Sequence, residues 1–214
     1  MAADRDPRDY EGAFAQAWAN PNYTRVEGPA IDVNEGLKGH YRVDRPVEYT
    51  GHHLWQTEVL KAWRPDHYIP GGVRPGSVRS WKLAGRVGGV EYLARYSDQR
   101  RRHDPSLFGR VVEDVCLNHA RRAATFLGRL EIKDDLGQQV FAATDQPLFF
   151  VEHSVGGTED APLNLWRSVH LTHTPDIEIP KFLGHIGRGN RLPPWIEVYC
   201  TRVLDIKVEF IGDR

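Results

Sequence analysis

The chain has 214 residues, of which 40% are hydrophobic, 10% aromatic and 27% charged, and its formal net charge is −1. This composition is typical of a globular protein with enough apolar residues for a sizeable core, and we expect one domain over residues 1–214. The nearly neutral charge gives no reason to expect a nucleic-acid or anionic-membrane partner.

The sequence also bears on the cellular compartment. Residues 1–23 carry charges where a signal peptide needs an apolar segment, and no later stretch is apolar over a membrane-spanning length. Only two cysteines are present, Cys116 and Cys200, each within a largely apolar stretch. They cannot form a disulfide framework, so we expect buried, reduced thiols in a cytoplasmic protein without a membrane partner.

The first third of the chain predicts two helices. Residues 9–20 (DYEGAFAQAWAN) form a short helix that ends before Pro21, and a polar stretch rich in glycine and proline continues to about residue 39. We therefore expect residues 1–39 to be a helical and loop extension of the domain. A strand interrupted by Pro46 follows. Residues 51–65 then predict a helix with Trp55 on its apolar side.

The middle of the chain predicts a strand pair over residues 78–98 and then one long helix over residues 103–130. Asp104 suits the N-cap of this helix, Pro105 its first position and Gly128 its C-terminal end. At 100° per residue, His119 lies near the centre of an apolar stripe. The stripe consists of Phe108, Val112, Val115, His119, Ala123 and Phe126.

The remaining sequence predicts β-structure. The segment DDLG at residues 134–137 indicates a hairpin turn, and residues 147–154 and 163–173 predict an antiparallel strand pair. From Ile196 to Phe210, apolar residues alternate with polar ones, which predicts a final strand of about 15 residues. Arg202 interrupts the apolar face of that strand.

A strand of this length is typical of a strongly curved sheet, whose concave face can receive the apolar stripe of a helix. The predicted fold class is therefore α+β: a strongly curved, mainly antiparallel sheet, a cone or half-barrel, with a long helix packed across its concave face. In this arrangement, His119 and Arg202 would meet in one cavity.

Four residues are candidates for a functional site. His119 is either a buried, neutral imidazole in a structural hydrogen bond or a catalytic general acid or base. Arg202 either lays its stem on apolar surface or binds a carboxylate, enolate or phosphate of the substrate. Trp166 and His170, on the second strand of the predicted pair, complete the expected substrate-binding set.

The ten histidines raise the question of a metal site. Across the strand pair, Glu152 or His153 could approach His170 or His173, but surface histidines explain the pattern equally well. Neither His52 with His53 nor His170 with His173 can chelate from a regular strand, because side chains at these spacings face opposite ways. We expect no metal.

The glycine-rich residues 181–195 resemble a phosphate cradle only superficially. No helix is expected to begin after the glycines, so the context of a nucleotide-binding loop is missing. Two interpretations of this segment stay open: a surface loop, or a lid that binds an anion. We therefore expect no cofactor.

Three functional hypotheses follow. The preferred one is a cofactor-independent enzyme of small-molecule metabolism, secondary metabolism included, with lyase, isomerase or cyclase chemistry in which His119 is the acid or base in an apolar pocket. The alternative is a non-catalytic carrier or accessory subunit, whose six tryptophans and eight tyrosines furnish a cavity or an interface. The third is a metal-dependent oxygenase or hydrolase with His and Glu ligands. The expected partner is a small organic molecule, and homo-oligomerisation is left open.

Overall fold

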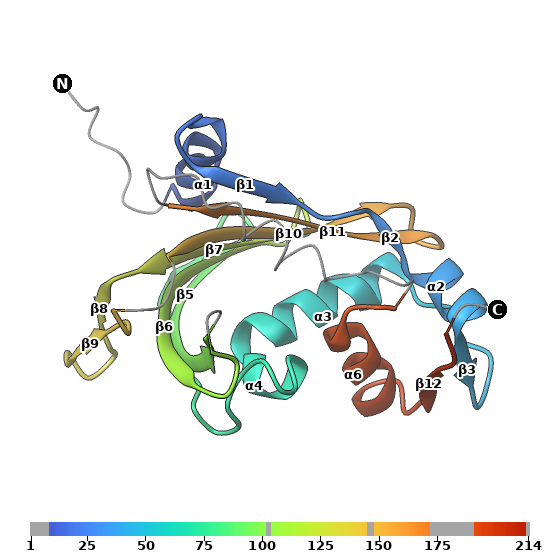
Figure 1. The fold of residues 1–214 in the computed structure, drawn as a ribbon. Coiled ribbons are helices and arrows are strands. Elements are labelled where there is room, and N and C mark those ends of the chain that lie inside the picture. Colours follow the sequence, from blue (N-terminus) through green and yellow to red (C-terminus); the bar gives the residue numbers. More distant parts are fainter. Residues whose placement is uncertain (1–8, 102–103, 145–147, 172–190, 213–214) are drawn as a thin grey trace.

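The computed structural model describes residues 9–101, 104–144, 148–171 and 191–212. Its main feature is one curved antiparallel sheet of eight strands (Figure 1). These strands are β1 (Thr24–Glu27), β2 (Ile31–Asp32), β4 (Arg79–Val87), β5 (Val90–Arg100), β6 (Phe108–Asn118), β7 (Ala123–Arg129), β10 (Phe149–Gly157) and β11 (Pro162–His170). Their order is β1-β11-β10-β7-β6-β5-β4, with β2 also paired to β11, and the sheet does not close into a barrel.

Helices cover both faces of the sheet. Figure 1 shows α1 (Tyr10–Ala19) on the convex side and α3 (Gly51–Trp63) running beneath the concave side. The other elements are α2 (Val33–His40), α4 (Pro65–Tyr68), α6 (Pro194–Arg202) and two small strand pairs, β3 (Tyr41–Val43) with β12 (Val208–Phe210) and β8 (Glu131–Lys133) with β9 (Gln139–Phe141).

The register of the strands decides which side chains reach α3. Asn164 of β11 donates a hydrogen bond to Glu58 of α3, which places Asn164 and the alternate residues Trp166 and Ser168 on the concave face. On the opposite face, residues such as Cys116 and Val169 pack against α1. Because the middle strands are covered on both sides, β7 is buried at six successive positions.

The predicted fold class is confirmed: a curved antiparallel sheet carries a helix across its concave face. The helix is α3, which the sequence predicted over residues 51–65, and α1 also lies where it was expected. The strand pair β4–β5, the hairpin around residues 134–137 and the antiparallel pair β10–β11 are confirmed as well.

The long helix predicted over residues 103–130 is wrong, because this segment forms the hairpin of β6 and β7. Burial on both faces removed the alternation typical of a strand and left apolar residues that also fit a helical stripe. The assumed caps have other roles. Asp104 accepts a hydrogen bond from the backbone N–H of Ser106 in a turn, and a Cβ at Gly128 would lie 2.6 Å from the carbonyl oxygen of Phe149.

The predicted final strand is also wrong over most of its length. Residues 194–202 form α6, which begins at Pro194, the first-turn position that proline favours. Its buried residues, Trp195, Ile196, Tyr199 and Cys200, follow helical spacing, although Ile196 and Cys200 also satisfy an alternating pattern. Only Val208–Phe210 form a strand.

The polar stretch predicted as a loop up to about residue 39 contains β1, β2 and α2. β1 pairs with β11, so this part of the chain completes the edge of the main sheet. The strand expected before Pro46 is short and ends at Val43. Among the described residues, no helix has both the length and the hydropathy needed to span a bilayer.

The two thiols give a test of this packing. Cys116 lies under α1 and Cys200 lies on α6, the reverse of the predicted element types, and both are free and buried. Burial raises the pKa of each thiol to about 12. We expect neither cysteine to react with a maleimide at pH 8 in the native protein and both to react in denaturant, as measured by mass spectrometry. Rapid native labelling of Cys116 would show that α1 does not cover the convex face.

Candidate functional site

A cavity of about 800 Å³ lies between the concave face of the sheet and the C-terminal part of α3. Trp195, in the first turn of α6, contributes to its wall. The apolar part of the wall includes Ile69, Val73, Val111, Val112, Phe126, Leu130, Phe141, Leu148, Phe149 and Val151. This volume is in the range that small organic ligands require.

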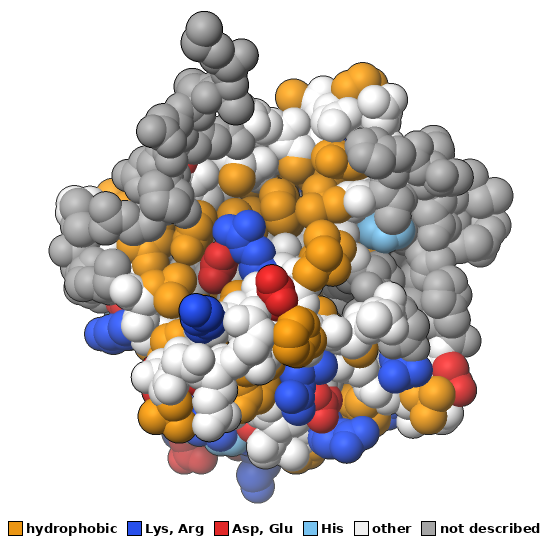
Figure 2. All heavy atoms as spheres, turned by 90° about the vertical axis from the view of Figure 1, so that its left-hand side faces the viewer, with side chains coloured by type: hydrophobic (Ala, Val, Ile, Leu, Met, Phe, Trp, Pro, Cys, Tyr) orange, Lys and Arg blue, Asp and Glu red, His pale blue; other side chains and the backbone are white. Residues whose placement is uncertain are grey.

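The apolar wall continues to the protein surface. Leu130 and Phe141 line the cavity and are 72% and 60% exposed. Figure 2 shows the face that lies at the left of Figure 1, where hydrophobic side chains gather across the middle with charged side chains among them. An apolar molecule therefore finds compatible surface next to the cavity.

A buried charged cluster forms part of the cavity wall. Lys61 Nζ lies 2.5 Å from Glu58 Oε2 and 3.1 Å from His153 Nδ1. The side chains of Lys61 and Glu58 are 4% and 0% exposed, and Asn164 donates to the second carboxylate oxygen of Glu58. Lys61 and His153 line the cavity. The ammonium group of Lys61 thus contacts the Glu58 carboxylate and the His153 imidazole at the wall of the cavity.

The surroundings shift the proton equilibria of this cluster. Burial, together with the nearby guanidinium of Arg95, lowers the pKa of Lys61 to about 8 against the opposing attraction of Glu58. Burial, together with the charges of Lys61 and Arg95, lowers the pKa of His153 well below its usual value. His153 is therefore neutral at pH 7. Its Nδ1 accepts from Lys61, which places the imidazole proton on Nε2.

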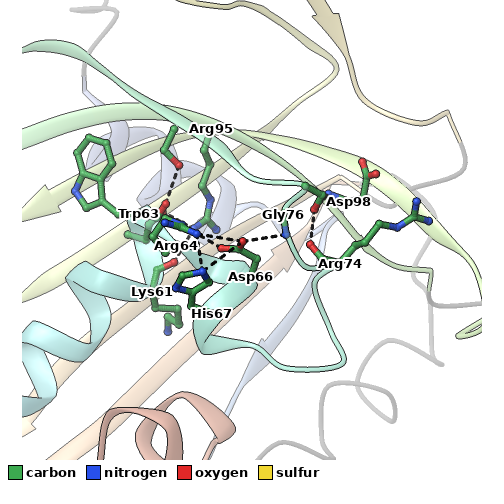
Figure 3. A network of polar contacts seen from close by, with 12 residues as sticks. Lys61, Trp63, Arg64, Asp66, His67, Arg74, Gly76, Arg95 and Asp98 are labelled. Carbon is green, nitrogen blue, oxygen red and sulfur yellow. Dashed lines mark hydrogen bonds and ion pairs between the residues drawn. The ribbon is translucent and has the colours of Figure 1, made fainter. Parts of the chain in front are cut away.

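Arg95 of β5 holds the end of α3 against the sheet. Its Nη1 donates to the carbonyl oxygens of Lys61 (3.1 Å) and Ala62 (2.7 Å), and its Nε donates to Glu113 at 2.7 Å. Figure 3 shows Arg95 reaching the turn where α3 ends, near Arg64 and the Asp66 network. The guanidinium thereby satisfies carbonyls that a helix C-terminus leaves unpaired.

Aromatic rings enclose the same cluster. Lys61 Nζ lies 4.1 Å from the centroid of the Trp195 ring, and the His153 ring is 5.4 Å from Trp195 and 5.9 Å from Phe126, both edge-on. A cation over an aromatic face is favoured by the ring quadrupole. The ammonium of Lys61 is therefore stabilised without access to bulk water.

Trp166 is the one predicted substrate-binding residue that the structure places at this cavity. It lies on the concave face directly across from His153, and 4% of its surface is exposed. His170 lies four residues after Trp166 on β11, where it pairs with Phe149 of β10, and the two rings are 4.9 Å apart. His170 does not line the cavity.

His119 and Arg202 do not meet. His119 follows β6, accepts a hydrogen bond at Nδ1 from Trp55 Nε1 (3.2 Å) and has Nε2 3.5 Å from Glu91. Arg202 is the exposed last residue of α6, because the strand expected to turn it inward is a helix. Neither lines the cavity. The catalytic role of His119 stays a prediction that the geometry does not test.

The described residues contain no group of three or more His, Cys, Asp or Glu side chains arranged to hold a metal. Glu152 and His153 face opposite sides of the sheet, and Glu152 pairs with Arg167 at 2.8 Å. His173 and most of the glycine-rich segment 181–195 lie outside the described residues.

Sequence reasoning missed Lys61, Glu58 and Arg95, and it considered His153 only as a metal ligand. One signal was available: on the helix predicted over residues 51–65, Glu58 falls in the apolar sector between Leu54 and Trp55. A carboxylate in that position needs a buried partner.

No protein-family model matches the chain, and no curated protein matches its sequence. Several solved structures show a remote likeness. The Zhui aromatase/cyclase from Streptomyces sp. R1128 has a TM-score of 0.42 and 11% identity over 85% of this chain and 98% of that chain. A START superfamily protein from Mycobacterium smegmatis has a TM-score of 0.41 and 12% identity over 69% of this chain and 88% of that chain. Ara h 8.0201 has a TM-score of 0.42 and 6% identity over 75% of this chain and 95% of that chain. Likenesses this remote say nothing about ligand or activity.

The Lys61–Glu58 pair can be tested against a matched pair in the same chain. Lys61→Met leaves the Glu58 charge buried and unpaired, so we expect it to lower the free energy of unfolding by about 3–5 kcal/mol. Adding Glu58→Gln should restore most of that loss. The measurement is urea unfolding followed by circular dichroism.

The control is Lys38→Met, because Lys38 and Glu35 have the same i, i+3 spacing on α2 but both side chains are 72% exposed. This change should have little effect on stability, since exposed ion pairs contribute little. Equal effects of Lys61→Met and Lys38→Met would contradict the burial of the Lys61 ammonium.

Proposed function

We propose that the protein binds a small, largely apolar organic molecule in the cavity and catalyses a cofactor-independent lyase-, isomerase- or cyclase-type step on it. Lys61, assisted by His153, replaces His119 as the group that moves the proton. The observation that carries the proposal is the Lys61 amine, with a pKa of about 8, on the wall of an apolar cavity of about 800 Å³.

The cluster has the properties that proton transfer requires. With a pKa of about 8, about one Lys61 side chain in ten is neutral at pH 7 and able to take a proton, while the rest can donate one. Glu58 and His153 fix the position of Nζ, and the surrounding aromatic rings exclude water. A base of this kind removes a proton from an activated C–H, and this proton abstraction is a step that many isomerases, cyclases and lyases share.

A non-catalytic carrier is the second candidate, and the mostly apolar wall of the cavity supports it. A carrier would retain its molecule unchanged. Extraction of the purified protein, followed by mass spectrometry, identifies any retained molecule, and incubation of that molecule with fresh protein shows whether it is converted. Conversion supports the enzyme, and quantitative recovery supports the carrier.

A surrogate substrate tests the proton-transfer proposal before the natural one is known. 5-Nitrobenzisoxazole opens when a base removes its ring proton. We expect the protein to accelerate this reaction with a rate that rises through an apparent pKa near 8, because neutral Lys61 is the base. In the Glu58→Gln/Lys61→Met double variant, the rate should fall by about 10²-fold or more. Product absorbance gives the rate.

Lys38→Met is the control for the loss of a lysine and should keep the full rate. Circular dichroism establishes that the double variant is folded. A folded double variant with an unchanged rate would contradict proton transfer by Lys61 and leave the carrier as the function.

A further inference from the structure

His153 presents one of its ring nitrogens to the cavity. Its Nδ1 accepts a hydrogen bond from Lys61 at 3.1 Å, so Nε2 carries the ring proton and points away from Lys61. Nε2 has no hydrogen-bond partner among the described residues, but it is not fully buried either. The His153 side chain is 12% exposed and lines the cavity. A ligand in the cavity can therefore reach Nε2.

The ammonium group of Lys61 leaves less room for a ligand. It has three N–H groups, and it has three neighbours: Glu58 Oε2 at 2.5 Å, His153 Nδ1 at 3.1 Å and the centroid of the Trp195 ring at 4.1 Å. Its side chain is 4% exposed, against 12% for His153. Direct contact with Nζ would cost a ligand the displacement of one of these neighbours, whereas contact with His153 Nε2 displaces none of them.

A neutral imidazole can pass a proton between these two positions. It accepts a proton at one nitrogen while it releases one from the other, and the exchange leaves the ring neutral. Neutrality matters here, because an imidazolium at His153 would be buried beside the charges of Lys61 and Arg95. The carboxylates of the cluster, Glu58 and Glu113, already pair with those two cations. Exchange through a neutral ring avoids the unfavourable third cation.

We propose that His153 is the catalytic residue that touches the ligand, and that its ring relays the proton between the ligand and Lys61. The proposal rests on the proposed function, since it concerns the same reaction in the same cavity. In the reactive state, neutral Lys61 accepts a hydrogen bond from Nδ1–H, and Nε2 presents its lone pair to the cavity. Nε2 takes the proton of the ligand C–H while Nδ1 gives its own proton to Nζ. The electron pair of the C–H bond stays on the ligand, the ring ends as the other neutral tautomer, and Lys61 becomes the ammonium that pairs with Glu58.

His153→Asn separates the relay from a structural role. The amide oxygen of asparagine can replace Nδ1 as the acceptor for Lys61, but an amide does not pass a proton on. With 5-nitrobenzisoxazole, we expect this variant to lose about 10²-fold in rate, as the Glu58→Gln/Lys61→Met double variant does. Combining all three changes should cost no more than the double variant, because the groups act as one unit. His52→Asn is the control, since His52 is an exposed histidine of α3, and it should keep the full rate.

Chemical rescue gives a second readout, which a purely structural role of His153 would not move. In His153→Ala, added imidazole should restore the rate with saturation, because it can occupy the vacated space and use both of its nitrogens. 1-Methylimidazole has only one free nitrogen, so it can act as a base but cannot relay a proton, and it should not restore the rate. Circular dichroism establishes that both His153 variants are folded.

The outcomes separate the relay from the proposed function. Rescue of His153→Ala by both bases, or by neither, would overturn the relay. A folded His153→Asn that keeps the wild-type rate and its rise near pH 8 would also overturn it, and would leave Lys61 as the direct base and the proposed function intact. If the wild type does not accelerate the reaction, both the relay and the proposed proton transfer are wrong.

Discussion

The guanidinium of Arg95 fixes where α3 ends on the sheet, and the candidate site depends on that position. Its hydrogen bonds to the carbonyls of Lys61 and Ala62 place the helix terminus over β5, while Glu113 on β6 balances its charge. The carbonyl end of a helix carries partial negative charge, so a cation is favoured there. The same cation faces the Lys61 ammonium and helps to lower its pKa. One side chain thus sets both the location of the amine and its readiness to lose a proton.

Stability alone does not account for the charges around the cavity. Lys61 with Glu58 and Arg95 with Glu113 place four ionisable groups in the interior, and apolar side chains of similar size often serve as well or better in such positions. Both pairs contribute residues to the wall of one cavity. The proposed proton transfer gives Lys61 and its partners a role beyond the strength of the fold.

Local signals predicted much of the fold, and they failed where packing on two sides removed them. The helix of residues 51–63 and the hairpins at Gly88 and at residues 134–137 carry their own start, stop and turn residues. The hairpin β6–β7 lacks a comparable sequence signal. Because α1 covers one of its faces and α3 the other, apolar residues do not alternate with polar ones along its strands. At residues 194–202 the error was the reverse, since a helix was predicted as a strand. Ile196 and Cys200 suit a strand as well as a helix, and Pro194, in the first turn, is the residue that favours the helix.

The candidate site was less predictable than the fold, since it joins residues that are distant in sequence. Within the charged cluster, only Glu58 carried a signal in the sequence, as a carboxylate in the apolar sector of a helix, and that signal was missed. That Lys61 meets His153, 92 residues away, depends on the register of β10 against β11 and on the point where α3 crosses them. His119 attracted attention because a false helix placed it in a core, whereas its bond to Trp55 holds the opposite part of α3. Trp55 and Lys61 thus anchor the helix at two points, and only the second reaches the cavity, because α3 packs directly on Leu117 and Ala124 at the first.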